Sequence, residues 1–125
     1  MSGDPIYTEM IIEYSRNPSN YGKIDDAHIH QHDSNPLCGD SIDLYLNIDG
    51  DKISDVKFDG KGCAICMACS SVLTEMIKGK TLEEAKEIRN QDIVDALELP
   101  AIKIHCSVLA EDSIHQAIKD YESKI

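Results

Sequence analysis

The chain is poor in aromatic side chains and in positive charge. It contains no Trp and one Phe, so its core has to be built from aliphatic side chains. With 12 Lys and Arg against 23 Asp and Glu, the net charge is −11, which excludes the basic face that nucleic acids and anionic membranes require. No apolar run approaches a membrane span, and no charged segment followed by an apolar one opens the sequence. We expect no nucleic-acid partner, no membrane partner, no export and a cytoplasmic location.

Length and cysteine content further narrow the class of protein. A chain of 125 residues without a repeat or linker fits one compact domain, residues 1–125. Five cysteines without an export signal indicate metal ligands or reactive thiols rather than disulfides.

Hydrophobic periodicity predicts an α+β fold, a three-stranded antiparallel meander sheet packed on one side by helices. Met10 and Val108 are among the residues expected to face the core. The expected strands are 27–33, 41–48 and 53–58, and the expected helices are 4–16, 64–77, 81–88, 91–97 (capped by Asn90) and 107–124.

The meander brings two cysteines together. Cys38 lies in the Asn-Pro turn before the second strand, and Cys63 follows the third strand. In an antiparallel meander these positions share one end of the sheet. We therefore expect a metal site at that end.

Three cysteines, Cys63, Cys66 and Cys69, form C-x₂-C-x₂-C. A ferredoxin motif would need a fourth cysteine followed by proline, but position 73 is Leu. We expect Cys63 to act with Cys38 and Cys106, and Cys66 and Cys69 mainly to pack in the core.

Cys63 and Cys106 precede expected helices, whose N-termini favour thiolates. Asp40 adds a carboxylate and His105 an imidazole, and three thiolates with one N or O ligand suit Zn²⁺ or an iron–sulfur cluster. On the residues alone, three unrelated buried cysteines remain an alternative. His28, His30 and His32 alternate as on one face of a strand, which fits either a zinc site or a polar exposed edge, and we leave the run unassigned.

The chain resembles the scaffold proteins of iron–sulfur cluster assembly, the IscU family and the related NifU N-terminal domain. The resemblance runs from the first helix to the last and rests on motifs at 17–22 (Asn-Pro-Ser-Asn-Tyr-Gly), 38–40 (Cys-Gly-Asp), 62–63 (Gly-Cys), 78–81 (Lys-Gly-Lys-Thr) and 103–107 (Lys-Ile-His-Cys-Ser).

The resemblance implies a SufE/NifU-like fold and a scaffold or carrier, not an enzyme. It implies a [2Fe–2S] cluster, with [4Fe–4S] as a variant, and Zn²⁺ or Fe²⁺ as alternative occupants. Cys38, Cys63 and Cys106 would be ligands, His105 a fourth ligand or neighbour, and Asp40 the residue that tunes cluster release. Cys106 would also accept persulfide sulfur. For the two extra cysteines, Cys66 and Cys69, the alternative to core packing is that one of them is a further ligand or resolves a persulfide.

The resemblance also implies partners: an IscS-like cysteine desulfurase, recipient apo-proteins, and a second copy of the chain around a cluster. Leu99, Pro100, Ala101, Ile102 and Lys103 resemble the family's Leu-Pro-Pro-Val-Lys segment for a DnaK-type chaperone with its co-chaperone. Here the second Pro is Ala and Val is Ile, and a plain connecting loop is the alternative.

Three other functions remain open. A SufU-type zinc-dependent sulfurtransferase shares the cysteine motifs, but its insertion between the second and third cysteines is absent and His105 is present here. A dithiol oxidoreductase using Cys63 and Cys66 would need a βαβ pattern around the motif. A structural zinc domain would keep its metal in a closed coordination site and turn nothing over.

Overall fold

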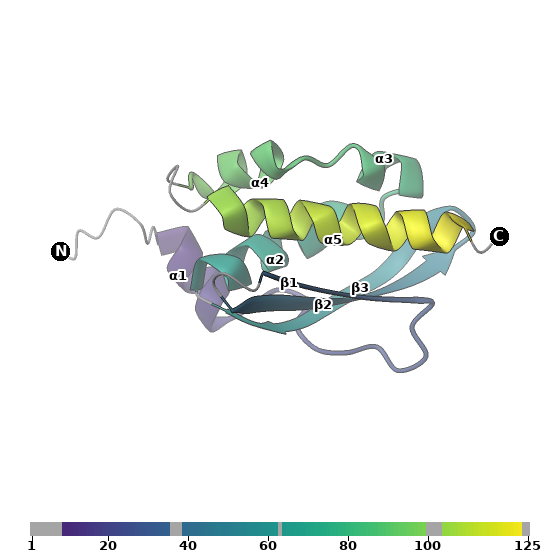
Figure 1. Cartoon of the computed structure of the whole chain (residues 1–125), viewed down its shortest axis with the longest axis horizontal. Helices are drawn as coiled ribbons and strands as arrows, with labels where there is room; N and C mark the ends of the chain where they lie inside the picture. The colour runs from purple at the N-terminus through teal and green to yellow at the C-terminus, as the bar shows by residue number, and fades with distance from the viewer. Residues whose placement is uncertain (1–8, 36–38, 63, 100–103, 124–125) are drawn as a thin grey trace.

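The computed structural model describes residues 9–35, 39–62, 64–99 and 104–123, without the side chains of residues 35, 104 and 105. A sheet forms one layer, and helices cover one of its faces (Figure 1), as the expected α+β class requires. The elements follow one another as α1 (Glu9–Arg16), β1 (Ile29–Asn35), β2 (Asp40–Asp49), β3 (Lys52–Lys61), α2 (Ala64–Ile77), α3 (Leu82–Lys86), α4 (Asn90–Leu97) and α5 (Ile104–Ser123).

The sheet is the predicted antiparallel meander. Within the described residues it has the order β1-β2-β3, with both pairs antiparallel. The turn between β2 and β3 contains Gly50 at φ +66°, a left-handed conformation that glycine adopts without steric cost. Because β2 and β3 run in opposite directions, the first residues of β2 lie beside the last residues of β3, at one end of the sheet.

One face of the sheet is buried. Ile42, Leu44, Leu46 and Ile48 alternate along β2 and are all at most 7% exposed, as period-two alternation predicts. On β3, Ile53 and Val56 are both fully buried although they are three positions apart. A register shift makes this possible, because Asn47 pairs with Asp55 while Ile48 pairs with Ile53. The extra residue is a β-bulge that turns both side chains to the same face.

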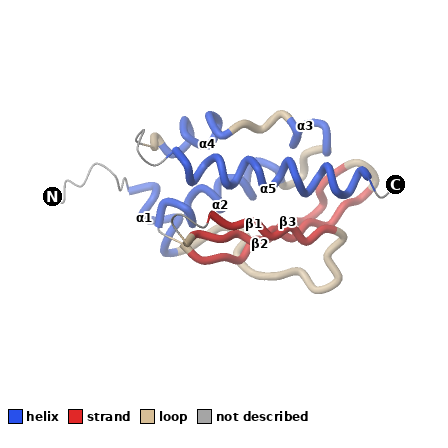
Figure 2. The backbone as a smooth tube through the Cα atoms, viewed as in Figure 1, coloured by secondary structure: helices blue, strands red, loops and turns tan. Residues whose placement is uncertain are grey.

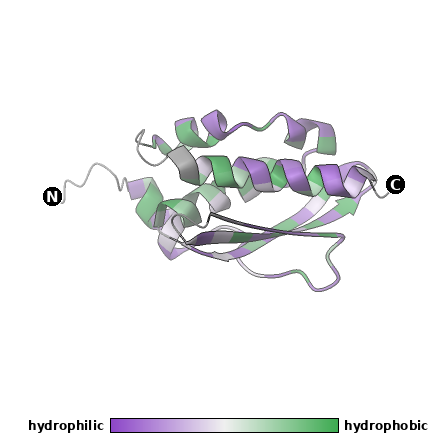
Figure 3. Cartoon of the chain, in the orientation of Figure 1, coloured by the Kyte–Doolittle hydropathy of each residue, from purple (hydrophilic) through white to green (hydrophobic). Residues whose placement is uncertain are grey.

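The helices α2 and α5 lie directly on this face, while α3 and α4 lie outside α5 (Figure 1). Hydrophobic and hydrophilic residues alternate along α5 (Figure 3), and its core side is Ala110, Ile114, Ala117 and Ile118. The expectation that Val108 joins this side was wrong, since it is 39% exposed. Two residues before Ala110, it points about 200° away around the helix. Met10 is likewise 44% exposed, because α1 buries Ile11 instead.

The connection between α1 and β1 runs across the face of the sheet away from α5 (Figure 2). Its start is anchored to α2, where Asn20 Nδ2 donates to Thr74 Oγ1 and Ser71 Oγ accepts from the Ser19 N–H. It also flanks β3, where the Gly22 N–H donates to the Phe58 carbonyl at 2.8 Å. The segment 17–22 is therefore hydrogen-bonded to both α2 and β3.

The short helices are capped, one of them differently from expectation. Thr81 and Glu84 form a capping box at the start of α3. In α4, Asn90 is the first helical residue rather than the cap, and the Arg89 N–H donates to the Asp92 carboxylate. The Asn90 amide reaches Ser107 Oγ on α5 instead. Among the described residues, no helix is both long enough and apolar enough to span a membrane.

Candidate metal and thiol site

Three segments that are distant in sequence meet at one end of the sheet. Asp40 is the first residue of β2, Cys66 lies in the first turn of α2, and Cys106 lies in the first turn of α5. Gly39, with φ +74°, makes the sharp entry into β2 that a side chain would hinder. α5 begins at Ile104 rather than at the expected residue 107, so Cys106 lies within the N-terminal turn, where backbone N–H groups favour a thiolate.

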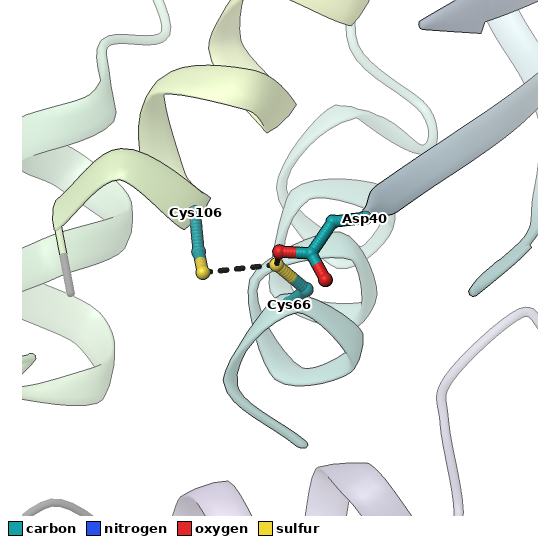
Figure 4. Close-up of side chains that lie close together, drawn as sticks. All are labelled: Asp40, Cys66 and Cys106. Atoms are coloured by element: carbon teal, nitrogen blue, oxygen red, sulfur yellow. Dashed lines mark hydrogen bonds between the residues drawn. The ribbon is translucent and has the colours of Figure 1, made fainter. Parts of the chain in front are cut away.

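The three side chains point toward one another (Figure 4). Cys66 Sγ lies 2.8 Å from Asp40 Oδ2 and 2.9 Å from Cys106 Sγ, both within hydrogen-bonding distance. Because a thiol carries one hydrogen, Cys66 can donate to one of these acceptors at a time. One atom from each residue lies within 4.8 Å of the other two. Cys66 is thus the middle member of the cluster.

The cluster is closed to solvent. Asp40 is 5% exposed, Cys66 8% and Cys106 2%. Beside the two sulfurs lies a cavity of about 10 Å³, which Met67 and Leu109 also line. This volume corresponds to about one water-sized group. A small atom can therefore be accommodated next to both thiols without opening the core.

Gly62 makes room for the cluster. A Cβ at this position would lie 2.6 Å from Asp40 Oδ1 and 3.2 Å from Cys66 Cβ. Both distances are shorter than ordinary nonbonded contact. The absence of a side chain at residue 62 therefore allows the carboxylate and the thiol to approach each other.

The donor set selects a class of metal. Thiolate sulfur beside a buried carboxylate suits zinc or iron, because thiolate ligands favour these metals over Mg²⁺ or Ca²⁺. A group that carries both thiols and an oxygen ligand is also suited to sulfur chemistry, since thiolates are nucleophiles. The geometry supports metal binding, sulfur transfer or both.

The sequence matches the family described as the NifU-like N terminal domain over residues 6–125. The chain belongs to this family. Among curated proteins it is 44% identical to the iron–sulfur cluster assembly scaffold protein IscU of Haemophilus influenzae, over 94% of this chain and 97% of the relative. It is 43% identical to IscU 1 of Archaeoglobus fulgidus, over 95% of this chain and 78% of the relative.

Solved structures of NifU-like proteins have the same fold. FiSufU of Fervidobacterium islandicum AW-1, proposed as an iron–sulfur cluster assembly scaffold for the SUF system, superposes with a TM-score of 0.80 at 34% identity. The alignment covers 93% of this chain and 98% of FiSufU. The N-terminal part of a NifU-like protein from Brucella abortus gives a TM-score of 0.78 at 22% identity, over 98% of each chain.

In this NifU-like chain, two predicted site residues, Asp40 and Cys106, lie in one cluster. Cys38, Cys63 and residues 100–103 lie outside the described part of the chain, as does the side chain of His105. Leu99, the first residue of the segment compared with a chaperone motif, is 8% exposed and packs in the core. The full ligand set therefore stays a prediction.

Sequence reasoning favoured core packing for Cys66 over a role in the site. The residue is buried, but its thiol contacts both Asp40 and Cys106. Cys69, given the same role, is fully buried in the hydrophobic core. The three-residue spacing did not separate Cys66 from Cys69, because the contact of Cys66 with Cys106 depends on how α2 and α5 pack.

The histidine run does not form one three-histidine site. His28 precedes β1, and its Nδ1 accepts the Ile48 N–H at 2.8 Å. His30 and His32 each bond Asp43 Oδ1 at 2.9 Å, and His30 also stacks on Tyr45. Although burial raises the pKa of Asp43, the hydrogen bonds and charges of the two histidines leave it below its usual value. The run is mostly a polar exposed strand face with a local carboxylate–imidazole network.

Proposed function

We propose that this chain is a scaffold that assembles an iron–sulfur cluster from iron and persulfide sulfur and passes it to recipient apo-proteins, acting as a carrier rather than an enzyme. The observation that carries the proposal is the buried meeting of Asp40, Cys66 and Cys106 at one end of the sheet. It agrees with the relatives named IscU, which align over nearly the whole chain. We further propose that residues 1–125 act as one domain in the cytoplasm.

The proposed ligands of the cargo are Cys38, Cys63 and Cys106, with Asp40 and His105 as weaker donors. Four thiolates would retain a cluster, whereas three thiolates with one oxygen or nitrogen ligand can give it up. Asp40 suits this role because its carboxylate already lies among the sulfurs. We propose a [2Fe–2S] cluster as the cargo, with Zn²⁺ or Fe²⁺ as other occupants.

Sulfur would enter through Cys106. Its thiolate attacks the outer sulfur of a persulfide on a cysteine desulfurase, so that the persulfide S–S bond breaks and the desulfurase thiolate leaves. The position of Cys106 in the first turn of α5 supports this assignment, since exposed N–H groups there stabilise the attacking thiolate.

Further partners belong to the same proposal. A DnaK-type chaperone with its co-chaperone would bind residues 99–103, and a second copy of the chain would share a cluster. Because Leu99 packs in the core, chaperone binding to this segment would withdraw its side chain and loosen the contact of α4 with α5. Such loosening would promote release of the cargo.

A SufU-type zinc-dependent sulfurtransferase is the second candidate. It is favoured by the structural similarity to FiSufU. The same thiols would then hold zinc and pass on persulfide sulfur without building a cluster.

The test is anaerobic assembly with ferrous iron, cysteine, a desulfurase and excess dithiol reductant, followed by iron and acid-labile sulfide measured per chain. Wild type should hold matched iron and sulfide, and Cys106→Ser should hold neither stably. Cys69→Ala is the matched control and should resemble wild type. Tightly bound zinc without sulfide in wild type would replace the scaffold with the sulfurtransferase.

A further inference from the structure

The proposed ligand set leaves Cys66 without a role, although its thiol is the middle member of the cluster. We propose that Cys66 is a resolving thiol: it attacks a persulfide on Cys106, forms a Cys66–Cys106 disulfide and releases hydrosulfide for cluster building. This rests on the proposed function in one respect, namely that Cys106 receives persulfide sulfur.

The two sulfurs lie close enough for a covalent step. They lie 2.9 Å apart, so a disulfide of about 2.05 Å needs an approach of about 0.9 Å. Two thiolates on one tetrahedral zinc, each about 2.3 Å from the metal, would lie about 3.8 Å apart. The sulfur–sulfur distance is thus about 0.9 Å longer than a disulfide bond and about 0.9 Å shorter than the separation of two ligands on one ion, so the two thiols are in contact and bond formation needs only a small movement.

The step balances without an unnamed reactant. Cys66 Sγ supplies the electron pair of the new bond to Cys106 Sγ, while the bond from Cys106 Sγ to the outer sulfur breaks. The outer sulfur leaves with that electron pair and its proton as hydrosulfide. The Cys66 proton passes to Asp40 Oδ2, which lies 2.8 Å away. A thiol reductant of the cell then reduces the disulfide before the next cycle.

Burial gives this internal route an advantage. Cys66 Sγ lies 2.9 Å from Cys106 Sγ, in a pocket where Cys106 is 2% exposed, so its attack needs no encounter with a dissolved thiol, which competes only in excess. The cavity of about 10 Å³ beside both sulfurs offers space for the outer sulfur. The two electrons that convert persulfide sulfur into sulfide thus come from the site itself.

The position of Cys69 makes the assignment specific. It lies three residues further along α2 and is fully buried in the apolar core, whereas Cys66 contacts Cys106. Cys66→Ala and Cys69→Ala are therefore matched variants that remove one buried thiol each from the same helix.

The experiment is a single turnover without iron or reductant, with a chelator present. The chain is loaded with sulfur from a desulfurase and cysteine, and in a parallel arm from inorganic polysulfide, which needs no desulfurase. Released hydrosulfide is quantified, and cysteine-containing peptides are mapped by mass spectrometry. Wild type should release hydrosulfide and yield a linked Cys66–Cys106 peptide. Cys66→Ala should keep the persulfide on Cys106 and release at least about tenfold less, whereas Cys69→Ala should follow wild type.

Several results would overturn the inference. These are a stable persulfide on wild-type Cys106, a Cys106 disulfide to another cysteine, equal release by Cys66→Ala, or failure of polysulfide to modify Cys106. Peptide mapping of wild type needs no variant to fold, and thermal melts show whether both variants do.

A separate arm distinguishes this role from ligation and from the proposed function. With excess reductant supplying electrons, Cys66→Ala should assemble cluster like wild type. Loss of iron from it under these conditions would make Cys66 a ligand and refute the resolving role. If wild type resolves persulfide but never holds iron with sulfide, the scaffold function fails while the inference stands.

Discussion

Gly62→Ala should alter the site while leaving the fold intact. The added Cβ would lie 2.6 Å from Asp40 Oδ1, about 0.9 Å inside the optimum for nonbonded atoms. The obstructing atom is the end of a side chain, so a rotation of Asp40 relieves the overlap. That rotation carries the carboxylate away from Cys66, and the oxygen donor leaves the cluster although every donor residue is still present.

Gly60 and Gly62 differ in the kind of atom that an added Cβ would meet. At Gly62, the overlap costs about 1 kcal/mol, and replacing glycine returns about 0.4–1 kcal/mol by restricting the unfolded chain, so the net change is small. At Gly60, a Cβ would overlap the Ser41 carbonyl oxygen, a backbone atom held in the sheet. Gly60→Ala should therefore lose about 1–3 kcal/mol.

Thermal melts and cluster transfer to an apo-protein acceptor measure the two effects. Gly62→Ala should melt within about 4 °C of wild type yet transfer cluster roughly tenfold more slowly, as Asp40→Ala should. Gly60→Ala should melt lower and, when still folded, transfer at the wild-type rate. Wild-type transfer by folded Gly62→Ala would refute the link from Asp40 position to release, and so would equal slowing by both variants.

Two further predictions concern stability and pH. The hydrogen bond to Glu75, with burial and the charge of that carboxylate, raises the pKa of Tyr14 from 10.0 to about 12. The stability that this hydrogen bond gives the folded chain is therefore complete below pH 10 and is lost as pH rises toward 12. After allowance for solvent screening this is about 1 kcal/mol, and urea titrations should show the loss in wild type but not in Tyr14→Phe. Burial raises the pKa of Asp43, but the hydrogen bonds and charges of His30 and His32 lower it overall. The stability that this pairing contributes is therefore present above the ordinary carboxyl pKa and is lost as pH falls through the lowered value. Asp43→Asn should be less stable than wild type at pH 6 and equally stable in strong acid, and an unchanged difference across that range would contradict the pairing.

Much of the fold could be read from local patterns. The strands and their antiparallel meander were predicted correctly, because alternation along β2 and a glycine after Asp49 are features of residues close in sequence. The β-bulge could not be predicted, since Ile53 and Val56 do not alternate and only the pairing with β2 explains their shared face. Val108 was misplaced for a similar reason: an apolar residue at a helix edge is assigned to a face only by what packs there.

The site was partly predictable for the same reason. The meander brought residues near Cys38 and Cys63 to one end of the sheet, and the structure places Asp40 there with Cys106. The role of Cys66 depended on how α2 and α5 pack, because only that packing brings its sulfur to 2.9 Å from Cys106 Sγ. No spacing within α2 encodes this distance between helices.

A scaffold has to combine tight assembly with easy release, and Cys66 bears on both. As a permanent fourth thiolate ligand it would hold the cargo and oppose the release that an oxygen donor such as Asp40 permits. As the proposed resolving thiol it would act before the cluster is complete, and Asp40, which accepts its hydrogen bond at 2.8 Å, would serve the sulfur step first and the cargo later. The close sulfur pair and the carboxylate are thus compatible in one pocket because they act at different stages. Cys66 and Cys106 would supply the electrons for sulfide, while Asp40 would leave the finished cluster weakly held on one side.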